Sequence, residues 1–281
     1  MATTYHRQLN HIFNRPTIEP EWYWSDHWEE GIFEDNPLSA FTFIETLLKD
    51  VKADLSPYSN DQIGLGLEYI FNNAISNLAC DFKIAPVPFK RKQEAICSLF
   101  VLFRDIFNPR CVAETAAFSQ EKSTPLNGIC YMFWDVCPLS TWIKFANTEE
   151  IGLSFMASLS EAELANMQLP EGVLDIMKQQ IAQSTATLKT REEIFAEGQQ
   201  QYKNIDIETK GYYEAIADVM QRCLELSNPA CVESGLHGLG HMATFLPDIA
   251  VPIIDDYLKN GKKRSETLEN YAEMARTGMI L

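Results

Sequence analysis

Apolar residues recur at helical spacing along most of the chain. From residue 37 onward they return every three or four positions, which places them on one face of a helix. The first such stripe contains Phe41, Phe43, Ile44, Leu47, Leu48 and Val51. Further stripes run through residues 63–78, 96–106 and 212–224. Segments with the alternation typical of strands are scarce. The pattern therefore predicts an all-α fold of stacked antiparallel helical hairpins.

Some elements are less clearly marked by the pattern. Residues 129–134 are apolar almost all round and fit either a central helix or a buried strand, of which we favour the helix. We expect Asp61 to cap the helix that follows the break at Ser56-Pro57. Thr190 and Glu193 have the spacing of a capping box, which predicts another helix start.

Two short segments of similar sequence interrupt the helical pattern. They are Ile-Phe-Asn-Pro-Arg-Cys-Val at 106–112 and Leu-Ser-Asn-Pro-Ala-Cys-Val at 226–232. Asparagine before proline favours a helix start, because asparagine can accept a hydrogen bond from a free N–H group and proline lacks a donor that would go unused there. We expect one helix to end at each of these Asn-Pro joints and another to begin, the first at 112–118. The repetition indicates that one helix–turn–helix unit is used more than once.

Residues 1–36 differ from the rest of the chain. They contain Pro16 and Pro20 and show no sustained hydrophobic period. We interpret them as an aromatic and acidic arm that packs on a single helical domain formed by residues 37–281.

The clearest helical unit lies at residues 211–261. It combines a helix, a turn with Pro229, a helix with the sequence Leu-His-Gly-Leu-Gly at 236–240, and a further helix closed by Asn-Gly at 260–261. This segment resembles a HEAT-type repeat, a signature with loose spacing. The resemblance covers about a fifth of the chain. It implies an irregular HEAT-like (ARM-type) solenoid or a helical bundle, and a non-enzymatic binding role.

The net charge of the chain favours some classes of binding partner over others. There are 39 acidic and 23 basic residues, which gives a net charge of −16. Such a chain repels nucleic acid and anionic membrane surfaces and attracts basic partners. The alternative is that the acidity serves solubility alone. We predict a basic protein partner, with no nucleic acid and no membrane.

Several features point to a cytoplasmic protein. The first residues lack the basic and then apolar layout of a secretory signal. The longest apolar run, at 95–103, is about half as long as a membrane-spanning helix. The seven cysteines do not show zinc-site spacing, and those at 97, 111, 223 and 231 fall in apolar helical patterns, which fits buried, reduced thiols.

Aromatic and acidic residues are concentrated between positions 21 and 35. Large rings often dominate binding energy, and carboxylates attract a basic partner. We therefore predict a partner-binding surface that consists of Glu21, Trp22, Trp24, Asp26, Trp28, Glu29, Glu30, Glu34 and Asp35. The alternative is that the rings pin the arm onto the helices while the acidic groups are solvated.

One group of residues has the types that bind metals. Glu233, His237 and His241 stand four residues apart, so on a helix they line one side. Two imidazoles and a carboxylate can hold Zn²⁺ or Fe²⁺. Gly238, however, stands where metalloproteases have glutamate. The alternative is that the histidines border the core and bond to backbone carbonyls, while Gly238 and Gly240 admit a close helix. We predict no metal and no cofactor, and keep the trio as the alternative.

Signatures of other chemistry are absent from the sequence. There is no Gly-x-Ser-x-Gly elbow and no phosphate loop, and the glycines at 64 and 66 lack the rest of a dinucleotide fingerprint. We interpret Asp135 as a helix-terminal or hydrogen-bonded residue. No residue is assigned a catalytic role, so we predict that the protein is not an enzyme.

These observations favour an acidic helical binding protein. Its acidity and lack of catalytic motifs are similar to those of bacterial toxin-neutralising immunity proteins. That weaker resemblance implies a protein that binds and neutralises a basic toxin or effector. One alternative is a metal-dependent enzyme, a hydrolase or oxygenase, that uses Glu233, His237 and His241. Another is an adaptor or chaperone that holds a peptide.

Overall fold

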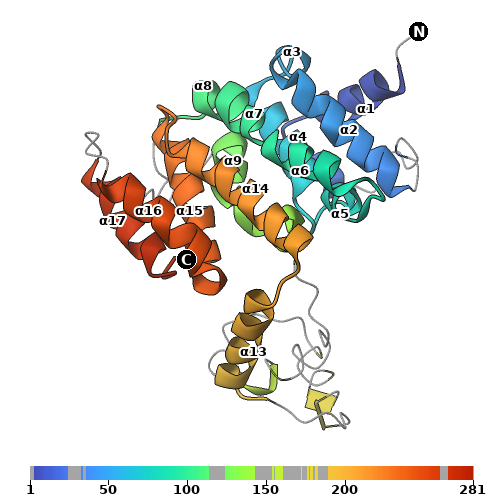
Figure 1. Cartoon of the computed structure of the whole chain (residues 1–281). Coiled ribbons are helices and arrows are strands. Elements are labelled where there is room, and N and C mark those ends of the chain that lie inside the picture. Colours follow the sequence, from blue (N-terminus) through green and yellow to red (C-terminus); the bar gives the residue numbers. More distant parts are fainter. Residues whose placement is uncertain are drawn as a thin grey trace. The chain divides into compact units, whose positions relative to one another are not determined.

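A computed structural model of the chain shows a helical protein (Figure 1). It describes residues 3–24, 33, 36–113, 124–142, 154, 156–160, 172, 176, 178–179, 181–182, 189–259 and 265–280. Within these residues the regular elements are helices and there is no strand, which confirms the all-α prediction. The same residues include no helix that is both long enough and apolar enough to cross a membrane.

The contacts of the chain divide it into two units. Unit 1 comprises Met1–Trp142 and Ile207–Leu281, and unit 2 comprises Ile143–Asp206. The two stretches of unit 1 meet where Trp142 stacks on Tyr212, with ring centroids 4.1 Å apart. The predicted division into an arm at 1–36 and a domain at 37–281 stays a prediction.

Unit 2 contains α13 (Arg191–Lys203). Its first turn is closed by the capping box expected from the sequence. The Glu193 N–H group donates to the Thr190 hydroxyl oxygen, and the Thr190 N–H group donates to the Glu193 carboxylate at 2.8 Å. The prediction of a helix start at this position is confirmed.

Unit 1 is built from short and medium-length helices that come before residue 143 and after residue 206 in the sequence. The first stretch contains α1 (Thr4–Phe13), η1 (Trp22–Trp24), α2 (Pro37–Lys49), α3 (Val51–Asp54), α4 (Asn60–Phe71), α5 (Leu78–Ile84), α6 (Phe89–Cys97), α7 (Phe100–Leu102), η2 (Phe103–Phe107), α8 (Asn108–Arg110), α9 (Pro125–Val136) and η4 (Pro138–Ser140). The second stretch contains α14 (Ile207–Cys223), α15 (Pro229–Phe245), α16 (Pro247–Lys259) and α17 (Glu266–Arg276). The last four helices pack against one another, and α15 contacts each of the other three.

Helix α4 differs in its bounds from the sequence expectation. Ser59, not Asp61, is its N-cap, because Gln62 completes a capping box with Ser59. The helix ends at Phe71, where Asn72 becomes extended, so the stripe expected to run to residue 78 is divided between α4 and α5.

Helix α9 packs against both α4 and α15. Residues 129–134, which the sequence left open between helix and strand, lie in this helix. Phe133 is fully buried and its ring lies against Phe71 and Phe103. Trp134 is 2 % exposed and stacks on Phe103. An element covered on opposite sides needs apolar residues on both, which explains most of the pattern, although Met132 is 38 % exposed.

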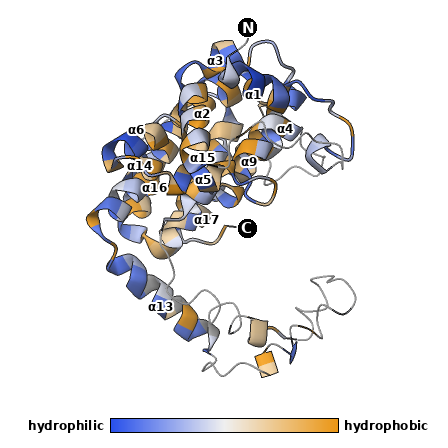
Figure 2. Ribbon diagram, turned by 90° about the vertical axis from the view of Figure 1, so that its right-hand side faces the viewer, coloured by the Kyte–Doolittle hydropathy of each residue, from blue (hydrophilic) through white to orange (hydrophobic). Residues whose placement is uncertain are grey.

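Helix α15 is buried along most of its length. Figure 2 shows apolar residues on α9 and α15, whereas α1 carries a hydrophilic surface. Glycines let neighbouring helices approach α15. A Cβ atom on Gly238 would lie 2.6 Å from the Trp134 ring, and one on Gly240 would lie 3.1 Å from the Ala275 Cα atom of α17. The expectation that these two glycines admit a close helix is confirmed.

The two Asn-Pro joints contact each other. The Asn228 N–H group donates to the Asn108 side-chain oxygen at 2.9 Å, and the Asn228 amide donates to the backbone oxygens of Asn108 and Cys111. Asn228 also caps α15 as expected, since its side chain accepts from the Ala230 N–H group.

The sequence predicted that a helix would end at Asn108 in the first joint, and this prediction is wrong. Asn108 has helical φ and ψ angles and donates its N–H group to the Phe103 oxygen, five residues back. This wider turn carries the chain through Pro109, and the helix ends at Arg110. The helix expected at 112–118 falls largely outside the described residues. The HEAT-type resemblance of residues 211–261 stays a prediction.

Candidate functional site

Three of the nine residues predicted to bind a partner are described: Glu21, Trp22 and Trp24. The other six (Asp26, Trp28, Glu29, Glu30, Glu34 and Asp35) lie outside the described residues. The three belong to or adjoin η1, the turn of helix that follows α1.

The two described tryptophans have opposite environments. Trp22 is 5 % exposed, and its ring lies 4.8 Å from Tyr69 of α4 and beneath the Arg15 guanidinium group. The Trp22 ring therefore anchors the segment on the helices, which is the alternative given for the aromatic residues in the sequence analysis. Trp24 is 57 % exposed and is open to contact by another molecule.

A cavity of about 590 Å³ lies beside this segment, between η1, α4 and α9. Its lining carries the carboxylates of Glu19, Glu21, Asp61 and Glu68. Among the described residues that line the cavity there is no lysine, arginine or histidine. Ile18, Leu65, Ile129, Met132 and Val136 supply apolar surface. The Tyr23 hydroxyl donates to Glu68 at 3.1 Å, and burial together with that carboxylate raises the pKa of Tyr23. We name this cavity the acidic pocket.

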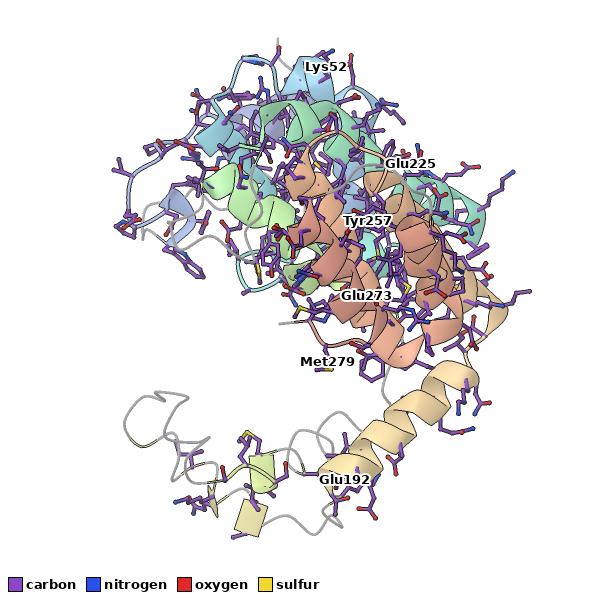
Figure 3. All side chains as sticks on the ribbon, turned by 90° about the vertical axis from the view of Figure 1, so that its left-hand side faces the viewer. Lys52, Glu192, Glu225, Tyr257, Glu273 and Met279 are labelled. Atoms are coloured by element: carbon purple, nitrogen blue, oxygen red, sulfur yellow. The ribbon has the colours of Figure 1, made fainter. Side chains whose placement is uncertain are left out.

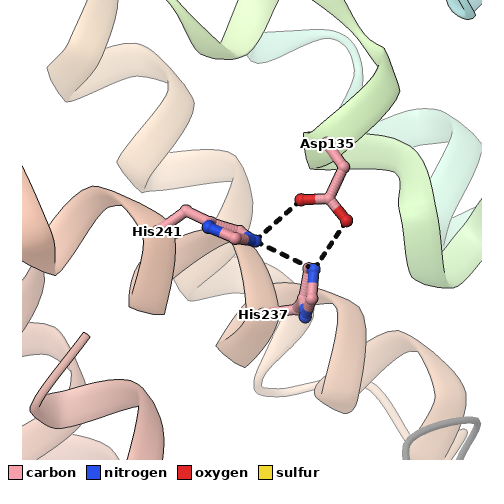
Figure 4. A group of neighbouring side chains, drawn as sticks. All are labelled: Asp135, His237 and His241. Carbon is pink, nitrogen blue, oxygen red and sulfur yellow. Dashed lines mark hydrogen bonds and ion pairs between the residues drawn. The ribbon is translucent and has the colours of Figure 1, made fainter. Parts of the chain in front are cut away.

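A second feature joins α9 and α15 through three polar side chains (Figure 4). His237 and His241 lie one turn apart on α15, and Asp135 lies in the last turn of α9. His237 Nε2 lies 2.8 Å from Asp135 Oδ2, and His241 Nε2 lies 2.8 Å from Asp135 Oδ1. The two Nε2 atoms are 3.1 Å apart. These three side chains form the Asp–His–His group.

Two tyrosines contact His237 of this group. The Tyr271 hydroxyl of α17 lies 2.6 Å from His237 Nδ1. It also lies 3.3 Å from the Tyr131 hydroxyl, and the Tyr131 ring lies 4.6 Å from the His237 ring. His237 is thus held at both nitrogens and along one ring face.

The three side chains of the Asp–His–His group differ in their exposure to solvent. The His237 side chain is 1 % exposed, that of Asp135 is 23 % exposed, and that of His241 is 47 % exposed. Burial favours the neutral form of Asp135, but hydrogen bonds from both histidines outweigh it and hold its pKa well below the usual range. Burial and the Tyr131 hydroxyl raise the pKa of Tyr271, so it keeps its proton. The group is therefore anionic at its centre and open to solvent at His241.

The structure supplies a different carboxylate from the one expected. Glu233 is buried on α15, but the three side chains whose possible ligand atoms lie within 4.8 Å of one another are Asp135, His237 and His241. Asp135 is hydrogen-bonded at a helix end, as the sequence suggested. The histidine nitrogens lie within hydrogen-bond distance of Asp135 and Tyr271 and close to each other, and these side chains replace the backbone carbonyls that were expected as their partners.

The buried thiols of Cys137 and Cys223 are not activated nucleophiles. Cys111, Cys223 and Cys231 are buried as expected, whereas Cys97 is half-buried. Burial raises the pKa of Cys137 to about 12 and that of Cys223 well above its ordinary value. A thiol that keeps its proton at neutral pH is a poor nucleophile.

Comparison of the chain with protein-family models, with curated proteins and with solved structures finds no match.

Proposed function

We propose that the protein acts in the cytoplasm as an acidic helical binding protein for a basic protein partner. Its most specific form is an immunity protein that occludes a basic toxin or effector, with binding and no catalysis of its own. The observation that carries this proposal is the acidic pocket, where four carboxylates line one cavity and none of the other described lining residues is cationic.

The chemistry of the pocket fits a lysine or arginine side chain. The carboxylates would pair with its charged end, and the apolar residues would hold its aliphatic stem. Trp24, exposed on the neighbouring turn, adds the type of ring that often contributes strongly to an interface. The net charge of −16 would attract a basic partner over longer distances and speed association.

The test is binding of the protein encoded next to this chain's gene, purified and measured at several salt concentrations. The pocket variant replaces three carboxylates: Glu21→Gln, Asp61→Asn and Glu68→Gln. The control variant, Glu192→Gln with Glu225→Gln and Glu273→Gln, removes the same charge from three exposed positions that are not among the residues lining the pocket; Figure 3 labels all three.

We expect the pocket variant to weaken binding by about 100-fold or more, since buried charge pairs contribute about 3 kcal/mol or more, and the control by about threefold or less. Equal losses in both variants would show that net charge alone attracts the partner. Failure of the neighbouring protein to bind, or its being acidic, would remove the immunity proposal.

A further inference from the structure

The three contacts within the Asp–His–His group cannot all be hydrogen bonds. Each Nε2 atom has one position in the plane of its ring, which holds either a hydrogen or a lone pair, and an ionised carboxylate contributes no hydrogen. If both nitrogens carry hydrogen, two N–H groups meet across 3.1 Å. If one nitrogen lacks hydrogen, its lone pair faces a carboxylate oxygen at 2.8 Å. Each arrangement leaves one short contact between like partners.

A cation at the centre of the group removes this conflict. Both ring nitrogens and the carboxylate can then direct lone pairs at one positive charge. Two ligand atoms about 2.1 Å from a metal ion and at right angles to each other are about 3.0 Å apart. His237 Nε2 lies 2.8 Å from Asp135 Oδ2, His241 Nε2 lies 2.8 Å from Asp135 Oδ1, and the two nitrogens are 3.1 Å apart. These separations match those of adjacent metal ligands when the carboxylate turns both of its oxygens toward the ion.

From this geometry we propose that Asp135, His237 and His241 bind one divalent transition-metal ion. Two imidazole nitrogens and one carboxylate suit ions such as Zn²⁺, Fe²⁺ or Co²⁺, whereas Ca²⁺ and Mg²⁺ prefer oxygen ligands. Because the His241 side chain is half exposed, the ion can enter from solvent and keep water in its remaining positions.

Tyr271 has the place of a positioning residue for this site. When His237 binds a metal through Nε2, its hydrogen resides on Nδ1, 2.6 Å from the Tyr271 oxygen. That bond fixes the ring orientation and the tautomer, as groups behind metal-binding histidines commonly do. The metal site does not depend on the proposed partner, so each can fail separately.

The first test measures metal binding by the purified protein without an affinity tag and after chelator treatment. Titration with Co²⁺, followed by its visible absorption, should show one equivalent bound, and Zn²⁺ should displace it. His241→Ala and Asp135→Asn should each weaken binding by about 100-fold, since loss of a ligand exceeds the effect of its supporting groups. Both side chains are partly exposed, so the variants should keep the wild-type circular dichroism spectrum.

Matched controls come from the same chain. His6→Ala removes an exposed histidine of α1, and Asp218→Asn removes an exposed carboxylate of α14; neither should alter Co²⁺ affinity. A wild-type protein that binds no Co²⁺ or Zn²⁺ would overturn the proposal and leave the group as a hydrogen-bonded link between helices. Unchanged affinity in the folded His241→Ala and Asp135→Asn variants would also overturn it.

A separate readout tests Tyr271. Tyr271→Phe should weaken Co²⁺ binding by about tenfold while one equivalent still binds at saturation. In the Zn²⁺-bound protein, ¹⁵N NMR should show the His237 hydrogen on Nδ1. A hydrogen on Nε2 in the presence of Zn²⁺ would contradict the assigned ligand atom.

Discussion

At the scale of single residues, Asn228 has two tasks that a sequence motif shows only in part. It caps α15, which the Asn-Pro pattern predicts. Its side-chain amide also donates to the backbone oxygens of Asn108 and Cys111. These two hydrogen bonds join residues that are 120 and 117 positions apart in the sequence. Local spacing predicts the cap because both partners are neighbours. It cannot predict the bridge, since that depends on how the helices pack.

Asn228→Ala should therefore be more damaging than loss of an ordinary cap. We expect a decrease of about 2–4 kcal/mol in the free energy of unfolding, of which about 1 kcal/mol is the cap and the rest follows from buried carbonyl groups left without donors. Urea denaturation measures the change.

Asn36→Ala is the control, because Asn36 caps α2 with a side-chain bond to the Leu38 N–H group. Its loss should cost about 1 kcal/mol. Equal costs for Asn36→Ala and Asn228→Ala would mean that the bonds to Asn108 and Cys111 contribute nothing.

At the scale of elements, the closest approach of α4 and α9 occurs at Gly64. A Cβ atom there would lie 2.4 Å from the Leu126 nitrogen and 2.5 Å from the Pro125 carbonyl carbon. These are backbone atoms, so relief requires movement of α9 as a whole. The glycines at 64 and 66 lack the rest of a dinucleotide fingerprint, and the contacts of Gly64 show that it is a helix-packing site instead.

Gly64→Ala should destabilise the protein by about 1–3 kcal/mol, because the overpacking outweighs the gain in helix propensity. Gly128→Ala in α9 is the matched substitution, since nothing lies within 4 Å of its added Cβ atom. It should stabilise by about 0.5–1 kcal/mol. Denaturant midpoints compare the two, and a stabilising Gly64→Ala would show that α4 and α9 are less tightly packed than described.

The elements and the site were not equally predictable from the sequence. Hydrophobic period and caps predicted α2, α13 and α15, because they depend on residues within a few positions of each other. The histidine pair was predicted for the same reason. For residues 129–134, which lie in α9, the apolar run only favoured a helix over a strand. Asp135 was noted only as a helix-end residue, because its approach to His237 spans 102 positions and depends on α9 packing against α15. Glu233 had the right spacing along the helix but lies outside the Asp–His–His group.

At the scale of the whole molecule, the dominant property is the excess of negative charge. Exposed carboxylates such as Glu192, Glu225 and Glu273 contribute to this net charge, which opposes the compact state because like charges are closer together there than in the extended chain. Added salt screens the repulsion between exposed charges that are more than about 10 Å apart at an ionic strength of 0.1 M.

Thermal unfolding should accordingly shift upward with NaCl. Between about 0.01 M and 0.15 M we expect a gain of about 1 kcal/mol, or about 2–4 °C in Tm. The variant with glutamine at positions 192, 225 and 273 should have a higher Tm at low salt and a smaller salt dependence. A Tm that decreases with NaCl would show that attractive ion pairs dominate.

Unit 1 draws its chain from both sides of residues 143–206, and this affects how the protein is made. During synthesis α9 leaves the ribosome well before α15, its main cover in the second stretch. Until then the aromatic face with Trp134 has no α15 to pack against. A nascent chain that pauses before residue 229 is therefore the species most in need of a chaperone, and coexpression of one should increase the yield of folded protein.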